Sequence, residues 1–437
     1  MKTKGEIDMQ NITAQTSMEA PNREYLELNF VGETATGRGN NQKFIMENLQ
    51  DGTFRATNAR VGITVGRHKP RSYILSMEEW DNTYRQKIQR GYLLTKKQKM
   101  EQKVIKKQGI TVDGEDYRVI DDEKVREIVI RLINYTKTYL DTNYTVKVED
   151  ISDEMISFGR EILNSLASDF SKMSVAEFNN KLKALYSAIP RRMDKLSNFL
   201  AKRKLDFNDI VANEQELFDT MVSQVRSGEK LNSYAVKPTI LEAYNLLWRC
   251  VTSEEEKQIR KMLQKNASEY VQAWRIVNQT TEKRFCDFCF SENLTESQGI
   301  SHLFHGSRSE NFWSIISNGL TINPMNVVVT GKMFGNGTYF APLAQKSLGY
   351  TSRRGSYWAS GNMDTGFLGV YKVATGKKYE VSCNDRSLNW KVLQAKCPGA
   401  HCTWAKSGVE LRNDEVIVYQ DCQSTIEYLI EIKRKKF

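Results

Sequence analysis

Leu303–Phe–His305–Gly306–Ser307 is the stretch of this 437-residue chain that decides its fold, because three further blocks follow it in a fixed order. They are Met333–Phe–Gly–Asn–Gly–Thr–Tyr339–Phe340–Ala341, Lys346–Ser347–Leu–Gly–Tyr350 and Asn413–Asp–Glu415–Val–Ile–Val–Tyr419. A single His-Gly-Ser triplet recurs by chance, whereas four ordered blocks indicate one functional unit. In the last block an acid opens an apolar run, which predicts a buried strand with a carboxylate at its start.

Together the four blocks resemble the NAD-binding core of the poly(ADP-ribose) polymerase family, whose ordered His-Tyr-Glu signature falls here on His305, Tyr339 and Glu415. The resemblance implies that these three residues are catalytic and that NAD is the substrate, with no metal required. The reaction it implies is transfer of ADP-ribose from NAD to a protein side chain, and then to ADP-ribose itself, with release of nicotinamide. The fold it implies for this part is α+β, on a split, mostly antiparallel sheet.

The chemistry explains why an acid is needed at position 415. Cleaving the bond between nicotinamide and ribose develops positive charge on an anomeric carbon, as glycoside hydrolysis does. A carboxylate at the start of a buried strand can accept a hydrogen bond from a ribose hydroxyl and stabilise that charge. Without the other blocks, Glu415 would be interpreted as an ordinary acid at a strand end.

The resemblance also implies how NAD is held. His305 would contact the adenosine-side ribose, and Gly306, which has no Cβ to block close approach, would bind the nicotinamide carboxamide through its backbone. Tyr339 and Tyr350 would stack on the two faces of the nicotinamide ring, and Ser347 would donate its hydroxyl to the carboxamide. The expected NAD-contacting residues are His305, Gly306, Ser307, Asn311, Tyr339, Phe340, Ala341, Ser347 and Tyr350.

The charge of the chain predicts an acidic partner. A net charge of +10 and a pI near 9.0 make nucleic acid the first candidate. Lysines are concentrated in the run Thr95–Lys107 and in the tail Lys433–Lys436. A solvated helical linker explains the first run equally well, so the run alone does not decide between the two interpretations.

Composition places the chain in a reducing compartment and away from membranes. No apolar run approaches the roughly 20 residues that a membrane span needs, and the polar N-terminus does not resemble a secretory signal. Seven cysteines are spread along the chain without the pattern of a disulfide framework. We expect a nuclear protein if the source is eukaryotic, and a cytoplasmic one if it is bacterial or viral.

Residues 25–92 predict several short strands followed by a helix over Ser76–Gln89 that opens with a capping box. The pattern resembles a WGR domain, a DNA-sensing module of several of these polymerases. The Trp-Gly-Arg of that family is replaced here by Asn58–Ala59–Arg60. Loss of the aromatic platform removes about 1–3 kcal/mol of base stacking, which weakens the expectation of tight binding to DNA ends.

Residues 120–227 carry apolar residues at the three- and four-residue spacing of helices. A capping box at Ser174–Glu177 opens one helix, which should end at Ile189–Pro190. The segment resembles the helical regulatory domain of DNA-activated members, although any helical bundle would show the same period. The expected organisation is a polar tail (1–22), a WGR-like domain with a basic linker (23–110), a helical regulatory domain (115–230) and an ADP-ribosyltransferase catalytic domain (231–437).

A set of cysteines offers a weaker alternative. The pairs Cys286 with Cys289 and Cys397 with Cys402 would suit tetrahedral zinc by ligand type. Their spacing matches no common zinc module, so reduced thiols are the favoured interpretation.

These expectations combine into one function. The chain should be a poly(ADP-ribose) polymerase that modifies protein acceptors, itself included, and is activated by broken or nicked DNA. Glu415 favours chain extension, because mono-transferases of the family often lack this acid, whereas the flank Arg412–Asp414 is unusual. The alternatives are a mono-ADP-ribosyltransferase and a catalytically weak module that binds NAD or DNA.

Overall fold

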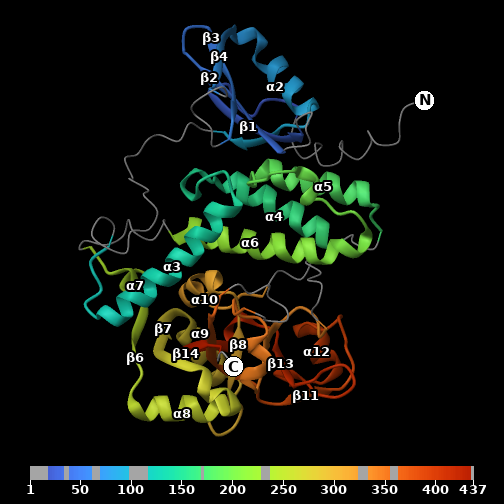
Figure 1. The fold of residues 1–437 in the computed structure, drawn as a ribbon. Coiled ribbons are helices and arrows are strands. Elements are labelled where there is room, and N and C mark those ends of the chain that lie inside the picture. Colours follow the sequence, from blue (N-terminus) through green and yellow to red (C-terminus); the bar gives the residue numbers. More distant parts are fainter. Residues whose placement is uncertain are drawn as a thin grey trace. The chain divides into compact units, whose positions relative to one another are not determined.

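The computed structural model describes residues 18–33, 39–61, 69–97, 117–168, 172–227, 237–322, 333–354 and 363–434 (Figure 1). The chain divides into two compact units. The first contains residues 1–109, 140–225 and 326–330, and the second contains residues 110–139, 226–325 and 331–437. No helix in the described ranges is both long and apolar enough to cross a membrane.

The first unit contains an antiparallel five-stranded sheet in the order β4-β3-β2-β1-β5. Its strands are β1 (Tyr25–Glu33), β2 (Gly39–Asn48), β3 (Thr53–Arg60), β4 (Arg71–Ser76) and β5 (Leu93–Lys96). Helix α2 (Trp80–Gln89) covers one face, because Trp80, Tyr84 and Ile88 recur every four residues and pack on the sheet. The predicted strands and the capping box at Ser76 and Glu79 are confirmed; a 3₁₀ turn over Met77–Glu79 precedes the helix.

The same unit contains three helices, α4 (Asp153–Ser168), α5 (Val175–Ala188) and α6 (Phe207–Ser227). The predicted capping box of Ser174 and Glu177 opens α5, which ends just before Ile189 and Pro190, as expected. Within this unit α5 is joined to the sheet, since the Val31 backbone N–H donates to the Ser187 hydroxyl at 2.9 Å.

The second unit is built on two sheets that are mostly antiparallel, as predicted. The larger has the order β6-β7-β14-β10-β8. Its strands are β6 (Leu246–Cys250), β7 (Tyr270–Asn278), β8 (Ile300–Gly306), β10 (Thr365–Ala374) and β14 (Ser424–Lys433). The smaller has the order β11-β12-β13-β9, in which only the β11–β12 pair is parallel. Its strands are β9 (Thr338–Phe340), β11 (Lys378–Val381), β12 (Cys402–Ala405) and β13 (Glu415–Val418).

One pair of hydrogen bonds joins the two sheets. The backbone N–H of Phe304 in β8 donates to the carbonyl of Ala341, directly after β9, and the N–H of Ala341 donates back to the carbonyl of Phe304, both at 2.9 Å. Strands β8 and β9 therefore meet where the larger sheet ends and the smaller begins. This junction brings the His-Gly-Ser block beside the block that contains Tyr339.

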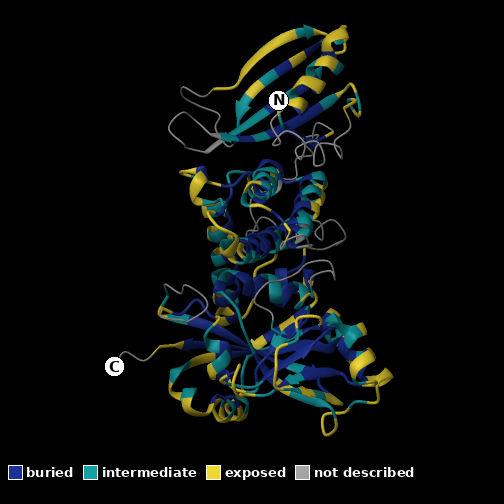
Figure 2. Ribbon diagram, turned by 90° about the vertical axis from the view of Figure 1, so that its right-hand side faces the viewer, coloured by how far each residue is buried: buried dark blue, intermediate teal, exposed yellow. Residues whose placement is uncertain are grey.

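Helices cover both faces of the larger sheet (Figures 1 and 2). The helices on one face are α3 (Glu123–Asn143), α7 (Ile240–Ala243) and α10 (Phe312–Asn318). Those on the other face are α8 (Ser253–Leu263) and α11 (Ala344–Leu348), while α9 (Gln279–Ser291) packs near the ends of β8 and β10. The central strand β14 is buried from Ser424 to Ile432.

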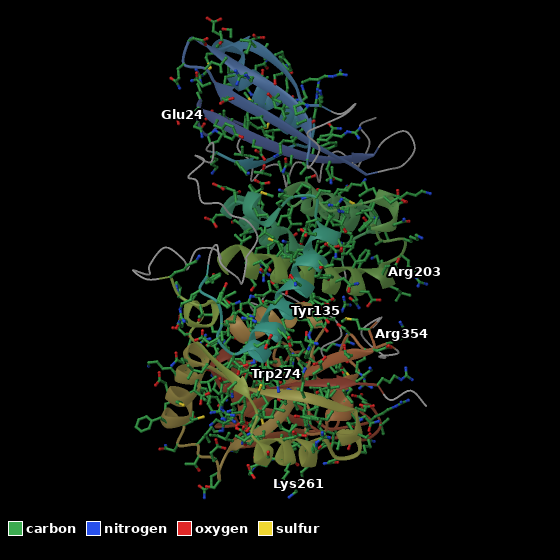
Figure 3. The ribbon with its side chains drawn as sticks, turned by 60° about the vertical axis from the view of Figure 1, so that its left-hand side comes forward. Glu24, Tyr135, Arg203, Lys261, Trp274 and Arg354 are labelled. Atoms are coloured by element: carbon green, nitrogen blue, oxygen red, sulfur yellow. The ribbon has the colours of Figure 1, made fainter. Side chains whose placement is uncertain are left out.

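Helix α3 is shared between the units. Its residues up to 139 belong to the second unit, where Val125, Ile128, Val129 and Leu132 enter the main hydrophobic core. Tyr135 of the same helix faces Phe367 of β10 with ring centroids 6.5 Å apart (Figure 3). Residues 140–143 of α3 belong to the first unit, and the predicted helical regulatory domain over 115–230 stays a prediction.

Candidate active site

His305 lies near the end of β8, directly at the junction of the two sheets. Its Nδ1–H donates to the backbone carbonyl of Tyr339 at 2.9 Å. Its ring stands near those of Phe340 and Tyr371, with centroids 5.8 and 6.0 Å apart. In a neutral imidazole this bond assigns the proton to Nδ1 and leaves Nε2 as the acceptor. The predicted His305 and Tyr339 are therefore adjacent, because the side chain of His305 bonds to the backbone of Tyr339.

Gly306 is required by the packing of α11. A Cβ at this position would lie 2.0 Å from the backbone carbonyl oxygen of Ser347. Ser347 itself is buried, and its hydroxyl donates to the carbonyl of Phe304 at 3.1 Å. The hydroxyl that we expected to donate to NAD is thus committed to the protein, although an oxygen that donates one bond can still accept another.

Tyr339 and Glu415 lie on the same face of the smaller sheet. Tyr339 of β9 pairs with Ile417 of β13, and Glu415 stands two residues before Ile417 on the same side. The Tyr339 hydroxyl donates to the carbonyl of Gly335 and accepts from the backbone N–H of Phe334, both at 2.9 Å. Burial raises the pKa of Tyr339, and Glu415 and Tyr350 raise it further. Tyr339 is therefore a fixed, protonated ring and not a proton donor at neutral pH.

Glu415 is only 6% exposed and is paired with a lysine. The Lys346 Nζ lies 2.8 Å from its Oε1 atom, and both side chains are mostly buried. A buried carboxylate without such a partner would be costly. In the sequence Lys346 is only one member of a block; its position immediately before Ser347 is the one signal that indicates a role.

Tyr350 completes the group of predicted ring residues. It follows α11 and is 39% exposed. Burial raises its pKa to about 12, with a contribution from the Glu415 carboxylate. The Glu415 carboxylate thus contributes to the raised pKa of both tyrosines.

The remaining predicted residues frame the site. The Asn311 side-chain amide donates to the Ser307 hydroxyl at 3.1 Å, and Asn311 is 8% exposed. Phe340 and Ala341 are buried; the Phe340 side chain enters the core, and Ala341 forms the junction with Phe304. Phe340 and Ala341 therefore hold the neighbouring Tyr339 through the core and the sheet junction.

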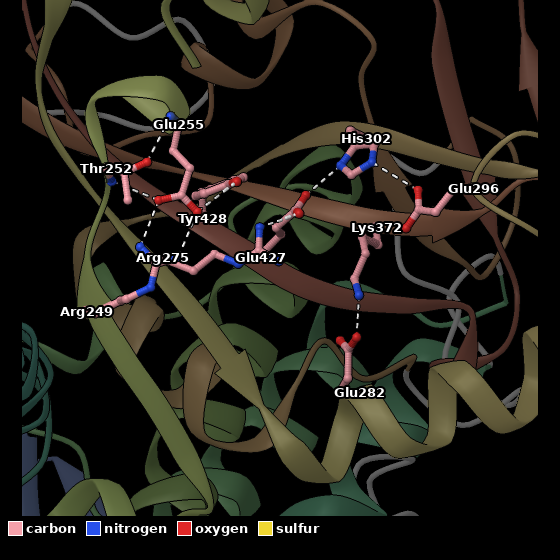
Figure 4. Close-up of polar contacts among 10 residues, drawn as sticks. All are labelled: Arg249, Thr252, Glu255, Arg275, Glu282, Glu296, His302, Lys372, Glu427 and Tyr428. Carbon is pink, nitrogen blue, oxygen red and sulfur yellow. Dashed lines mark hydrogen bonds and ion pairs between the residues drawn. The ribbon is translucent and has the colours of Figure 1, made fainter. Parts of the chain in front are cut away.

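A second histidine close in sequence belongs to a different cluster. His302 lies three residues before His305, so it points to the opposite face of β8. Its ring bonds to Glu427, which also pairs with Arg275, in a network that spans the strands (Figure 4). The bond to Glu427 raises the pKa of His302. This network joins strands of the larger sheet, and no pattern in the sequence predicted it.

The cysteines considered for zinc do not form a ligand set in the described part of the chain. No group of three or more His, Cys, Asp or Glu residues there could hold a metal ion. Burial raises the pKa of Cys289 to about 11 and that of Cys402 to about 12, so both remain thiols at neutral pH. The thiol of Cys402 donates to the carbonyl of Thr375 at 3.3 Å.

Comparison with known proteins identifies the class. Residues 253–410 match the poly(ADP-ribose) polymerase catalytic domain. The poly(ADP-ribose) polymerase-like protein 100L of Invertebrate iridescent virus 6 is 33% identical over 148 residues, which cover 33% of this chain and 76% of the viral protein. Poly [ADP-ribose] polymerase 1 of Gallus gallus is 32% identical over 153 residues, 30% of this chain and 14% of that protein. Poly [ADP-ribose] polymerase 2 of Homo sapiens is 41% identical over 83 residues, 19% of this chain and 12% of that protein.

The fold and these matches define an NAD-dependent ADP-ribosyltransferase. The chain belongs to the poly(ADP-ribose) polymerase family, and NAD is its substrate. The family match ends at residue 410, before Glu415, so that the place of this acid in the site comes from the sheet pairing described above.

Replacing Gly306 with alanine tests the close packing of α11 on β8. The added Cβ would overlap the Ser347 carbonyl, so the backbone of β8 or α11 has to move. We expect a loss of roughly 1–3 kcal/mol in the free energy of unfolding, as for other overpacked sites, together with a loss of nicotinamide release from NAD. Gly408→Ala is the control, since no atom lies within 4 Å of a Cβ there. Wild-type stability in Gly306→Ala would contradict this packing.

Proposed function

We propose that this protein transfers ADP-ribose from NAD to protein acceptors, itself included, and then extends the chain on the attached ADP-ribose. The observation that carries the proposal is Glu415, a buried carboxylate that is paired with Lys346 and lies on the same sheet face as Tyr339. An acid with this setting is suited to bind a ribose hydroxyl and to oppose positive charge. His305, Gly306, Ser307, Asn311, Ser347 and the two tyrosines supply the surroundings for NAD.

The proposed reaction follows from these positions. Tyr339 and Tyr350 hold the nicotinamide ring, and the bond from its nitrogen to C1′ of the ribose breaks with both electrons leaving on nicotinamide. The Glu415 carboxylate stabilises the positive charge left on the ribose. An acceptor hydroxyl oxygen then attacks C1′, and its proton passes to solvent water. In chain extension that oxygen is a ribose hydroxyl, and Glu415 orients it by accepting its hydrogen bond.

Lys346 has a defined part in this scheme. Its ammonium pairs with a carboxylate that is almost fully buried, and so holds that carboxylate in place until the ribose charge develops. The runner-up function is transfer of a single ADP-ribose. The residues before Glu415 are unusual for the family and bear on that choice. One of them, Asp414, accepts hydrogen bonds from Trp404 Nε1 at 2.7 Å and from the backbone N–H of Ser407 at 2.8 Å.

Glu415→Gln separates the two products. The amide retains the size of the side chain but removes its charge, and loss of one preorganised electrostatic contact costs on the order of 10²–10³ in rate. We expect chain extension to collapse while NAD still binds, read as product length on gels beside nicotinamide release. Glu380→Gln is the control. Glu380 is exposed, pairs with Lys406 and lies on β11, at the opposite edge of the same sheet from β9. Polymer of normal length made by Glu415→Gln would refute the assignment.

A second proposal concerns DNA and rests on the first unit. At Asn58, where the WGR family has tryptophan, the side-chain oxygen accepts a hydrogen bond from Lys87 Nζ at 3.2 Å. The same ammonium lies 3.8 Å from the centroid of the Phe44 ring. Arg71 pairs with Asn58 across β3 and β4, so its side chain shares the face.

Two further cations lie near Asn58 and Lys87. Arg60 stands two residues after Asn58 on the same side of β3, and the charge of Arg90 acts on Lys87. The lysine-rich run Thr95–Lys107 lies mostly outside the described residues. We infer that this face binds DNA through its phosphates and not by stacking on a base, and that broken DNA bound here activates the enzyme through the helices of residues 115–230.

The pKa of Lys87 makes the DNA proposal testable by pH. Burial, with a smaller contribution from Arg90, lowers that pKa to about 8. The positive charge is therefore present below pH 8 and lost as the pH rises through it. We expect Lys87→Gln to weaken DNA binding at pH 7 and to reduce the slope of log affinity against log salt by about one, whereas at pH 9 wild type and variant should bind alike.

Arg55→Gln is the matched control for Lys87→Gln. Arg55 lies on the same strand but three residues from Asn58, so it faces the other side, where it pairs with Glu47 at 3.0 Å. Fluorescence anisotropy with a nicked duplex gives both affinities. If Arg55→Gln weakens binding as much as Lys87→Gln does, the DNA face is wrongly assigned.

A further inference from the structure

We propose that Ser352 and Arg353 are positioning residues that hold Tyr350 at a set distance from the segment Ser307–Asn311, and that they thereby determine the affinity for the nicotinamide end of NAD. The inference rests on the proposed function, in which Tyr350 is one wall of the nicotinamide site. Neither residue belongs to the four sequence blocks, and neither touches the reacting bond in the proposed scheme.

The need for such a device follows from the exposure of Tyr350. Its side chain is 39% exposed, so packing around the ring alone does not hold it. The three polar residues that follow it are all buried. Thr351 is 0% exposed, Ser352 6% and Arg353 8%. The position of the ring is therefore determined by the backbone on either side, which is α11 before it and this buried segment after it.

Ser352 joins the two walls of the site. Its hydroxyl oxygen accepts a hydrogen bond from the backbone N–H of Ser309 at 2.8 Å. Ser309 is fully buried and lies between Ser307 and Asn311, which bond to each other at 3.1 Å. One hydroxyl thus connects the segment that follows the His-Gly-Ser block to the segment that follows Tyr350. Its removal would leave a buried N–H without a partner, which is costly.

Arg353 fastens the same segment to the rest of the unit. Its guanidinium forms a two-bond pair with Glu269, with N–O distances of 2.9 and 3.1 Å. Paired bonds of this kind fix direction as well as distance, and a lysine cannot reproduce them. Strand β10 closes the segment from another side, since a Cβ at Gly366 would lie 2.9 Å from the Arg353 Cγ and 3.1 Å from the Thr351 Cβ.

The effect on catalysis should be confined to binding. Tyr350 contacts the nicotinamide ring before and during bond cleavage, so a displaced ring weakens the ground state and the transition state together. Such uniform binding changes KM and leaves kcat largely unaltered. A merely structural role would instead lower the amount of active enzyme, and with it kcat, at unchanged KM.

The test uses the full-length protein and three variants, Ser352→Ala, Arg353→Lys and Glu269→Gln. Nicotinamide release gives KM and kcat for NAD, and inhibition by 3-aminobenzamide reports the nicotinamide site alone. We expect KM and the inhibition constant to rise together by about three- to tenfold, the size of one lost hydrogen bond, with kcat within twofold of wild type. If Ser352→Ala does not fold, the two milder variants at the ion pair decide the question.

Arg249→Lys is the matched control. Arg249 makes the same kind of two-bond pair with Glu255, at 2.7 and 2.8 Å, near the end of the edge strand β6 and outside the proposed site (Figure 4). It should leave KM and inhibition unchanged. If the control shifts KM as much as Arg353→Lys does, or if the three variants lower kcat at constant KM, the positioning role is overturned.

A double-mutant cycle tests the positioning role of Ser352 separately from the proposed nicotinamide site. If Ser352 acts through Tyr350, then Ser352→Ala should add nothing to the rise in KM already caused by Tyr350→Ala. Additive effects would overturn the positioning role while leaving the proposed nicotinamide site intact. A Tyr350→Ala variant with wild-type KM and inhibition would instead refute the nicotinamide site itself.

Discussion

The exchange of hydrogen bonds between Phe304 and Ala341 is the constraint on which the site depends. It joins two sheets whose strands come from distant parts of the sequence. Through β8 it places His305 and Gly306, and through β9 and its partner β13 it places Tyr339 and Glu415. The Phe304 carbonyl also accepts the hydroxyl of Ser347, so α11 is held at the same point. A shift of this junction would move the predicted catalytic residues relative to one another.

The charged groups of the site, unlike the apolar core around them, are not explained by their contribution to the stability of the fold. Burying the Glu415 carboxylate and the Lys346 ammonium together removes both from water, and apolar residues of similar size would stabilise the fold as well or better. The polar network of His302 and Glu427 on the opposite face of β8 contributes to holding strands together. The Lys346–Glu415 pair joins the short helix α11 to the start of β13, and under the proposed function it serves the chemistry and not the fold.

Local signals in the sequence were sufficient for the elements and for the signature residues. The capping boxes at Ser76 and Ser174 depend on residues three apart, and the strands depend on alternation, so both could be recognised without a structure. The pairing of Lys346 with Glu415 and the bond from Ser309 to Ser352 join residues far apart in the chain, and no local pattern indicates them. The periodicity of residues 123–143 predicted a helix but not the core into which it packs.

The packing of helix α3 limits how far the chain can be truncated from its N-terminus. The core of the second unit includes Tyr117, Ile120 and the apolar side of α3, and the Arg118 backbone N–H bonds to the carbonyl of Pro238 at 2.8 Å. A chain that started at residue 231 would keep every signature block yet lack the part of this core that Tyr117, Ile120 and α3 supply. The second unit is thus discontinuous in sequence, and a truncation at the end of α6 would remove part of its hydrophobic core.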